Sequence, residues 1–585
     1  MISAQKKNLE QLTSFHNSQR LTIDGVHFLK LRGTSRERAQ AHAQLLKAEI
    51  FEGVLPYLAT KNEWLIRRAP GILQNKTLQN LVAGFYNKIF LPFAYRALPE
   101  GQKKVMEDFA EYSGLPFATI RSAVLQAEGL MFLSRFSVMQ YLAERERLGC
   151  TSAVVLKENT LEKRLLVARN MDYPVVGAWE KQPTVLFHEP TEKDEIPHVA
   201  VTSAGVHTSG LTAMNAEGLT LATHAHFGKS FSSRGMPIIT LGNEVISKAH
   251  SLEEAIQIAK NHRRSAHWAF VVASAKENDA IVIEMSPTET YVRHAENEEG
   301  LLVHSNYFQT ELRKKEAFLS GAVQQDLKAR VCRMRDILKE YGTNVSYQAL
   351  ISALGDHRSL QSKWYHVYGD TLSAITTIKS VMFEPELQKL WVSSRKESPT
   401  GLGDFLEVEV DQFWKENNET PEEHRWKSIP NQRYWKEFNE AVHHYHEAYK
   451  TWHTHNHEEG YGQKTLEHLR KATEVQLEVR DEYLWMQRGL VAFALSEYAE
   501  ARTCFESIHK ENVDAHVFQV RDLFLARTYD LIGYNESARK LLQRHTQFSD
   551  PRLEKAFARN RRKKYREEDK KTLLLDLQFP DAMQY

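Results

Sequence analysis

A series of short β-rich segments that begins at Cys150 limits the fold more than any other feature of the sequence. Runs rich in β-branched, aromatic and small apolar residues are typical of strands, and six of them follow one another closely between residues 152 and 223. Because connections this short leave no room for crossovers, we expect mostly antiparallel pairing. The predicted strands are 152–156, 165–168, 184–188, 198–202, 211–214, 219–223, 269–273, 280–284, 289–294 and a last hairpin, 374–383 with 389–393.

Helices are predicted between and around these strands. Apolar residues at helical spacing mark 238–249, 252–262 and 324–341, and such amphipathic helices must bury their apolar stripe against another layer. The order predicts two layers of strands with helices packed outside, an α+β sandwich.

The chain on either side of the strand-rich part reads as helical. Helices are predicted at 35–49, 78–95 and 102–112 before it, and throughout the chain beyond about residue 425 after it. Residues Trp485, Gly489, Tyr498, Ala501 and Phe505 have the spacing of a tetratricopeptide-type helix pair, in which small residues let two helices approach. We therefore predict a helical segment 1–149, a core 150–400, a linker 401–425 and a tetratricopeptide-like domain 426–585.

Composition excludes several kinds of partner. Lysine plus arginine (76) balance aspartate plus glutamate (75) among 585 residues, so no strong field attracts nucleic acid or an anionic membrane. No stretch approaches the ~20 apolar residues that span a bilayer. The three widely separated cysteines argue against a disulfide framework, and with a polar start to the chain they predict a cytoplasmic location.

Cys150 is the candidate nucleophile. It begins the first predicted strand, and the next strand ends in Arg169 and Asp172, which a hairpin of this length returns close to the cysteine. A nearby cation favours the thiolate, and a carboxylate can orient a base. For a lone cysteine the more common explanation is a buried thiol beside a surface ion pair, since free cysteine is often buried.

Motifs elsewhere in the chain make the pattern more specific. The segment 31–35 with Arg38, Ala39 and His42 resembles the opening motif of the acyl-coenzyme A:6-aminopenicillanate acyltransferase (peptidase C45) family, related to choloylglycine hydrolases and penicillin V acylases, although two customary glycines are alanines here. The segment 214–219 resembles the family's N-E-x-G-L loop, 304–308 its T-N-H-F loop, and 328–333 the helix that carries its arginine. The resemblance covers about residues 25 to 395.

The resemblance implies a fold, a reaction and a set of site residues. It implies a four-layer αββα N-terminal-nucleophile sandwich, a self-cut between Gly149 and Cys150, and a Cys150 thioester formed from a linear, non-peptide acyl amide, with no cofactor. The new α-amine, whose free pKa is near 8, would then take the thiol proton. By the resemblance, Arg169 would hold the thiolate and Asp172 would accept a hydrogen bond from the amine. Asn215 would donate to the oxyanion, Asn306 would line the same site, and Arg330 would anchor the network. Without the resemblance, each asparagine is better explained as a turn cap.

Three further residues are weaker candidates for substrate binding. His224 and His226 lie at strand spacing and so face one direction, where they could bind substrate or metal. A polar strand face is the better interpretation, and we predict no metal. Tyr173, which follows Asp172, is grouped with them.

Two function classes remain open at this stage. The favoured one is a self-cleaving cysteine amidohydrolase or acyltransferase, and the alternative is an inert sandwich whose C-terminal helices bind a protein partner. The sequence leaves open the acyl group, the amine, hydrolysis against acyl transfer, and whether the chain forms a homo-oligomer.

Overall fold

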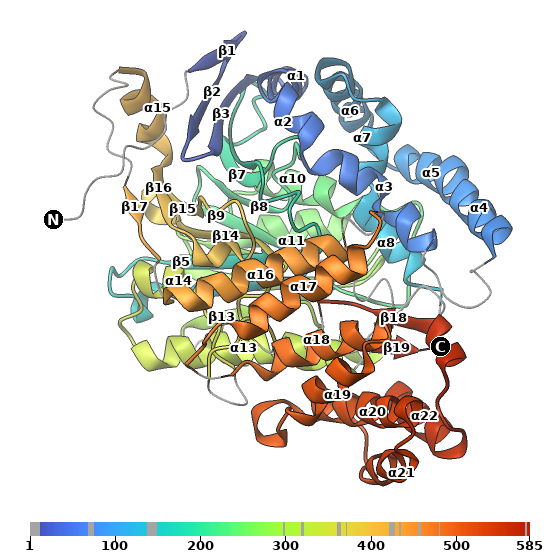
Figure 1. Ribbon diagram of the computed structural model, residues 1–585. Coiled ribbons are helices and arrows are strands. Elements are labelled where there is room, and N and C mark those ends of the chain that lie inside the picture. Colours follow the sequence, from blue (N-terminus) through green and yellow to red (C-terminus); the bar gives the residue numbers. More distant parts are fainter. Residues whose placement is uncertain are drawn as a thin grey trace.

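A computed structural model describes residues 12–584, apart from 68–74, 137–148, 297–298, 317–320, 360–363, 370, 420–426, 432–433, 454–457, 479 and 579–581. Two large β-sheets lie at its centre with helices on both sides (Figure 1). The predicted mixed α+β class is therefore confirmed.

The larger sheet has ten strands in the order β1-β2-β3-β6-β7-β8-β9-β10-β11-β12. All neighbours are antiparallel except β3 and β6, which run parallel from the pair His27 and Thr184 to the pair Gly33 and Pro190. The strands are β1 (Thr13–Phe15), β2 (Ser18–Ile23), β3 (Val26–Gly33), β6 (Pro183–Pro190), β7 (His198–Ser203), β8 (Thr212–Asn215), β9 (Leu219–Ala225), β10 (Trp268–Ser274), β11 (Asp279–Met285) and β12 (Thr290–His294).

The second sheet has seven strands in the order β13-β4-β5-β14-β15-β16-β17. Cys150 lies in β4, which is the second strand of this sheet and pairs with the edge strand β13. The strands are β4 (Gly149–Val155), β5 (Leu166–Asp172), β13 (Leu301–His304), β14 (Thr377–Glu384), β15 (Lys389–Ser393), β16 (Phe405–Glu409) and β17 (Ser428–Ile429).

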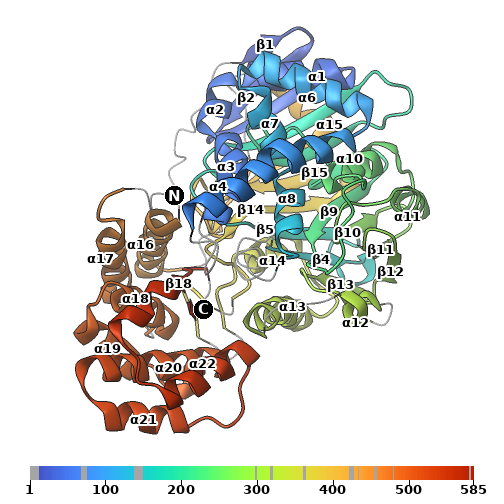
Figure 2. The same cartoon turned by 90° about the vertical axis from the view of Figure 1, so that its right-hand side faces the viewer.

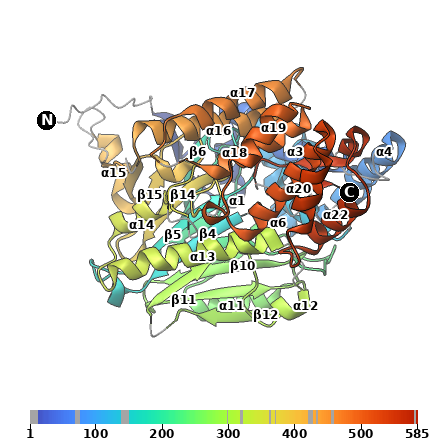
Figure 3. The same cartoon turned by 60° about the horizontal axis from the view of Figure 1, so that its bottom comes forward.

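The two sheets pack face to face through one apolar core. Because side chains alternate along a strand, Val154 and Val167 of the second sheet meet Phe28, Val185 and Val271 of the first in this core. The opposite face of the second sheet is covered by α13 (Gly321–Tyr341) and α14 (Tyr347–Leu354). Figure 3 shows α13 running beside β4 and β5.

Helices cover the outer face of the larger sheet as well. They share one apolar cluster with its strands, and α1 begins at Thr34, whose side chain and that of Glu37 form a reciprocal capping box. The helices before Cys150 are α1 (Ser35–Leu45), α2 (Lys47–Glu52), α3 (Val54–Arg67), α4 (Lys76–Phe85), the π-helical turn Tyr86–Phe90, α5 (Leu91–Arg96), α6 (Glu100–Ser113), α7 (Phe117–Val124) and α8 (Gln126–Leu133); within the core are α10 (Ile238–Lys248), α11 (Leu252–Asn261) and α12 (Leu312–Glu316).

Two predicted segments differ from the structure. The helical segment 1–149 also contains β1, β2 and β3, which extend the larger sheet. The predicted linker 401–425 is wrong over its first part, because β16 pairs with β15 and is followed by helix α15 (Val410–Glu419). Phe413 and Trp414 of α15 enter the core between the sheets. Burial of these two side chains therefore favours an ordered strand and helix here, although the Ser, Pro and Gly residues just before them are typical of a linker.

The last of the C-terminal helices, within residues 498–562, lie at the end of the molecule opposite α1 and α6 (Figures 1 and 2). Gly489 permits the predicted close approach, since a Cβ there would lie 2.7 Å from the Phe505 ring. The helices are α16 (Lys436–His453), α17 (Tyr461–Glu474), α18 (Glu482–Ala494), α19 (Tyr498–Glu506), α20 (Ala515–Ile532), α21 (Asn535–Gln543) and α22 (Pro551–Arg562), followed by the hairpin β18 (Leu573–Leu575) and β19 (Ala582–Gln584). The tetratricopeptide-like assignment stays a prediction.

Buried polar contacts join these helices to the sandwich. His366 Nδ1 lies 3.1 Å from Asp481 Oδ1 at the start of α18, and the Tyr434 hydroxyl accepts a hydrogen bond from the His357 N–H at 2.7 Å. None of the described helices is both long and apolar enough to cross a bilayer.

A buried carboxyl on α8 makes stability depend on pH. Glu128 is fully buried, its Oε1 accepts the Ile238 N–H at 2.8 Å, and its Oε2 has no hydrogen-bond partner among the described residues. Burial raises its pKa from 4.5 to about 7. The protonated form is thus favoured by folding, so this contribution to stability is fully present below pH 4.5 and is lost as the pH rises through about 7.

We expect Glu128→Gln to be more stable than the wild type at pH 8 and nearly equal to it at pH 4.5. Urea unfolding at the two pH values measures this, with Glu111→Gln on the exposed face of α6 as the control. Equal shifts in midpoint at both pH values would contradict the burial argument.

Candidate active site

Cys150 is held at the beginning of β4 on the face that looks toward the other sheet. It shares that face with Ser152 and Val154, because alternate residues of a strand point the same way. Cys150 lies directly across from Met171 of β5 and is 1% exposed. Its sulfur therefore lies inside the molecule, at the end of the core between the sheets.

Arg169 places a cation on this sulfur, as the sequence predicted. Its Nη2 lies 3.2 Å from Cys150 Sγ and also donates to the Thr223 carbonyl. Its Nη1 donates to the Leu211 carbonyl and, at 2.6 Å, to Thr212 Oγ1. Four contacts fix the guanidinium, which is positioned to stabilise a thiolate.

Asn306 holds the backbone nitrogen of Cys150. Its Oδ1 accepts the Cys150 N–H at 2.5 Å, and its Nδ2 donates to the Ala225 carbonyl at 3.0 Å. The residue follows β13, the edge strand that pairs with β4. The structure thus brings Asn306 into the site, on the nitrogen that would become the α-amine.

Asp172 and Arg330 form a buried ion pair beside Gly149. Arg330 Nη1 donates to Asp172 Oδ2, while Thr377 Oγ1 donates to Asp172 Oδ1 at 2.7 Å. Asp172 pairs with Gly149 across the strands, and a Cβ on Gly149 would lie 3.1 Å from the Asp172 Cβ. The carboxylate therefore lies against the residue before Cys150, whereas the Cys150 N–H itself is bonded to Asn306.

Asn215, the predicted oxyanion donor, is bonded to backbone groups around a turn. Its Nδ2 donates to the carbonyls of Ile246 and Ala249 at 3.1 and 3.0 Å, at the end of α10. Its Oδ1 accepts the N–H groups of Glu217 and Leu219. Oδ1 thus closes the β8–β9 turn, and both amide hydrogens are used to tie that turn to α10. This arrangement is that of a turn cap, and the oxyanion role stays a prediction.

The two asparagines should respond differently to substitution. We expect Asn215→Ala to lower stability by about 2 kcal/mol or more, because it leaves buried backbone groups without partners, and to change kcat of the folded protein little. Asn306→Ala should impair self-cleavage and activity. Thermal unfolding together with initial rates tests this, and a kcat loss confined to the Asn215 variant would favour the oxyanion role instead.

His224 and His226 are interior residues. His224 Nε2 lies 2.8 Å from Ser152 Oγ between the sheets, and His226 Nε2 lies 3.1 Å from His304 Nε2. Burial lowers the pKa of His226 to about 3 and that of His224 well below its ordinary value, so both rings are neutral. Neither lines the pocket described below, and a role for either ring in substrate binding stays a prediction.

Lys379 is a site residue that the sequence analysis did not find. It lies across from Met171 on β14, so Cys150, Met171 and Lys379 form a row on one face of three strands. Its Nζ donates to the Val201 carbonyl at 2.7 Å and lies 5.7 Å from the Trp179 ring centroid. Burial and the Arg169 charge hold its pKa well below the ordinary value. The sequence signal that could have identified it is a lysine inside an otherwise apolar strand, where a charged side chain is unusual.

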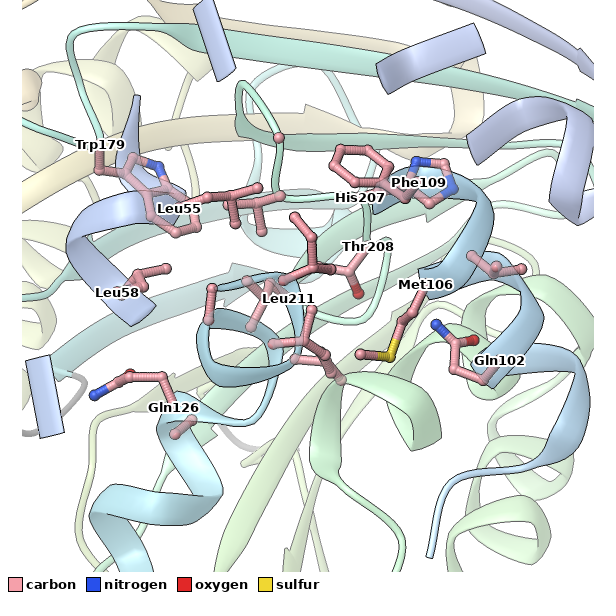
Figure 4. A pocket seen from close by; sticks show the side chains of 18 of the residues that line it. Leu55, Leu58, Gln102, Met106, Phe109, Gln126, Trp179, His207, Thr208 and Leu211 are labelled. Atoms are coloured by element: carbon pink, nitrogen blue, oxygen red, sulfur yellow. The ribbon is translucent and has the colours of Figure 1, made fainter. Parts of the chain in front are cut away.

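A largely apolar pocket reaches Met171, the residue directly across from Cys150, although Cys150 itself does not line it. We call it the apolar pocket and define it by Leu58, Met106, Phe109, Met171, Tyr173 and Trp179; it contains about 840 Å³ of empty space, its open mouth included. Figure 4 shows Trp179, Leu58 and Gln126 at one end and Gln102 and His207 at the other. Tyr173 thus lines the pocket, and its hydroxyl donates to Gln126 Oε1; that it binds substrate stays a prediction.

The N-terminal helices build one wall of this pocket. Leu58 comes from α3, Met106 and Phe109 from α6, and the Cys150 end is formed by Met171 and Tyr173. The Leu211 carbonyl, bonded to Arg169, belongs to another lining residue. The chain before Cys150 therefore shapes the space next to the sulfur. Among the described residues, no cluster of histidine, cysteine and carboxylate groups could hold a metal ion.

A buried cysteine at a strand start, a guanidinium on its sulfur and an adjoining apolar pocket define a candidate cysteine-nucleophile site. Residues 158–398 match the family described as acyl-coenzyme A:6-aminopenicillanic acid acyl-transferase. The resemblance is thus confirmed over a range that contains Arg169, Asp172, Asn215, Asn306 and Arg330 and begins after Cys150.

Several solved structures show a distant likeness. One of them is a mutant of the conjugated bile acid hydrolase from Clostridium perfringens, 12% identical, with a TM-score of 0.29, and the likeness covers 48% of this chain and 96% of that one. A search of curated proteins gives no match.

Proposed function

We propose that the protein is a cysteine N-terminal-nucleophile amidohydrolase or acyltransferase that cuts its own Gly149–Cys150 bond and then attacks linear, non-peptide acyl amides through Cys150. The packing of two sheets between helical layers supports the corresponding four-layer αββα fold. The observation that carries the proposal is the 3.2 Å contact between Arg169 Nη2 and Cys150 Sγ, next to an apolar pocket.

The self-cut requires the sulfur to attack the carbonyl carbon of Gly149. The C–N bond breaks as the C–S bond forms, the Cys150 nitrogen takes the thiol proton, and water then hydrolyses the thioester. The absence of a side chain on Gly149 matters, because any Cβ would press on Asp172. The products are a new carboxyl end at Gly149 and a free α-amine on Cys150.

That amine supplies the base for the second reaction. Its pKa is ordinarily about 8, so near neutral pH a useful fraction can take the thiol proton. Asn306 Oδ1, which already accepts a hydrogen bond from this nitrogen, would orient it. Asp172, beside the space that Gly149 occupies, would meet the positive charge that the amine gains.

The reaction with the substrate then breaks and forms the same kinds of bond as the self-cut. The sulfur attacks the amide carbonyl, the amine part leaves with the proton held by the α-amine, and the acyl group remains as a thioester on Cys150. Water or a second amine then releases it. We place the acyl part in the apolar pocket, whose wall is mainly aliphatic and aromatic.

Mass analysis tests the first reaction directly. The purified protein should give two chains, and sequencing of the larger one should begin at Cys150. A panel of N-acyl amides with apolar acyl groups tests the second reaction. A fully active protein that remains a single chain would refute the self-cut, and a cut protein inactive on every amide would refute the substrate class.

A further inference from the structure

A second, polar pocket opens from the end of the apolar pocket that lies away from Cys150. We call it the polar pocket and define it by Arg38, His188, His198, His207, Asn243 and Ser247. The two pockets share Gln102, Val105, His207 and Thr208 as lining residues. Figure 4 places Gln102, His207 and Thr208 on the side opposite Trp179 and Leu58. An occupant can therefore extend from the sulfur end into the polar pocket.

His188 is the residue whose polar groups the fold leaves without partners. It is 6% exposed, its ring stacks on His198 with centroids 4.6 Å apart, and neither ring nitrogen has a hydrogen-bond partner among the described residues. Leaving a buried polar group unbonded costs about 1–3 kcal/mol. A ligand that bonds to this ring would recover part of that cost.

The neighbouring histidines have defined hydrogen positions. His42 Nε2 accepts the Gly205 N–H at 3.1 Å, so its proton is on Nδ1, which donates to His207 Nδ1 at 3.1 Å. The His207 proton is then on Nε2. His198 Nδ1 donates to the Ile196 carbonyl at 2.8 Å, which leaves its Nε2 as an acceptor. The polar pocket thus offers a donor and an acceptor from neutral rings.

The charges indicate what kind of group would bind. Burial lowers the pKa of His198 to about 4 and that of His207 to about 3, and it lowers that of His188 well below the ordinary value. The Arg38 guanidinium is already bonded to the Gly33 carbonyl, Glu192 and Glu195. Two carboxylates thus outnumber the one cation, so an anionic ligand would gain no unpaired positive charge.

We propose that the polar pocket binds the far end of the acyl group, and that this end carries a neutral hydrogen-bonding group, namely a hydroxyl. The inference rests on the proposed function for the reaction at Cys150 and adds the substrate class. The acyl part has an apolar body, which fills the apolar pocket, and a hydroxylated end, which bonds to His188 and its neighbours.

Matched probes test the inference. The 4-nitroanilides of dodecanoic acid and 12-hydroxydodecanoic acid differ only in the terminal hydroxyl, and shorter and longer pairs allow for the unknown span. We expect kcat/KM to favour the hydroxylated probe by about threefold to tenfold, the value of one net hydrogen bond. His188→Phe should remove the preference, so that the ratio of kcat/KM for the hydroxylated and plain anilides falls to about one.

The variant should fold, because phenylalanine keeps the ring shape and no hydrogen bond within the protein is lost. An unchanged melting temperature checks this, and His294→Phe on the exposed strand β12 is the matched control, which should keep the preference. Equal rates on both probes, or a preference that survives His188→Phe, would overturn the proposal.

Calorimetry separates this inference from the proposed reaction. Cys150→Ala keeps every residue of both pockets, so it should bind the hydroxylated anilide more tightly than the plain one even if the wild type hydrolyses neither. Hydrolysis without preference would refute the hydroxyl site alone. If the variant binds neither probe at any of the chain lengths tested, the hydroxyl site is refuted as well.

Discussion

Replacing Cys150 by alanine is expected to leave one uncut chain that lacks amide-cleaving activity. Alanine has no sulfur to attack the Gly149 carbonyl, and no later step can substitute for the missing nucleophile. We expect the rate on any accepted acyl amide to fall by at least about a thousandfold. Intact-mass analysis and initial rates measure the two effects separately.

The other cysteines provide the controls for this experiment. All three are free; Cys332 is exposed on α13, and Cys504 is buried in α19. Cys332→Ala should therefore be cut and active like the wild type, and it also shows that thiol loss alone does no harm. Normal cutting in the Cys150 variant would refute the proposed chemistry at its first step.

Breaking the Asp172–Arg330 pair should have the second largest effect, this time on stability. Both side chains are under 5% exposed, and removing one partner leaves a charge that water cannot reach. We expect Arg330→Met to lower the free energy of unfolding by about 3–5 kcal/mol. Urea unfolding measures the change, and mass analysis of the remaining folded protein reports on self-cleavage.

A double-variant cycle shows that the pair is the cause. Asp172→Asn combined with Arg330→Met should cost less than the sum of the two single changes, because the double variant removes both charges of the pair. The contact of Arg330 Nη2 with Asp326 Oδ2, at 2.8 Å, is lost in both Arg330 variants and so cancels in the cycle. Lys276→Met, which breaks an exposed pair with Glu217, should cost about 1 kcal/mol or less. Additive losses, or a single loss as small as that control, would contradict the argument.

The strand order along the chain was predictable for a local reason. Alternation of side chains and short connections are written in neighbouring residues, and β4 to β12 begin and end within a few residues of the predicted bounds. Segments β1 to β3 were missed although a local signal was present, since Asp24-Gly25 forms the two-residue turn of the β2–β3 hairpin. What the local pattern does not give is their place in the larger sheet. That place is set by β3, which pairs with β6, about 150 residues away in the sequence.

The residues of the candidate site also differ in whether a local pattern or only the tertiary structure places them. Arg169 could be placed near Cys150 from the hairpin alone, and the structure puts it on the sulfur. Asn215 could not be judged from its motif, because its partners Ile246 and Ala249 come from a helix that follows later. Lys379 was missed since only the sheet order brings β14 beside β5.

The sequence by itself determined the kind of layers and the hairpin that carries Cys150, since both follow from periodicity and short-range turns. Tertiary structure alone decided what surrounds the sulfur: the N-terminal helices that wall the apolar pocket, the bond from Asn306 to the Cys150 nitrogen and the unbonded ring of His188. These depend on contacts between residues tens to hundreds of positions apart, which no local pattern encodes.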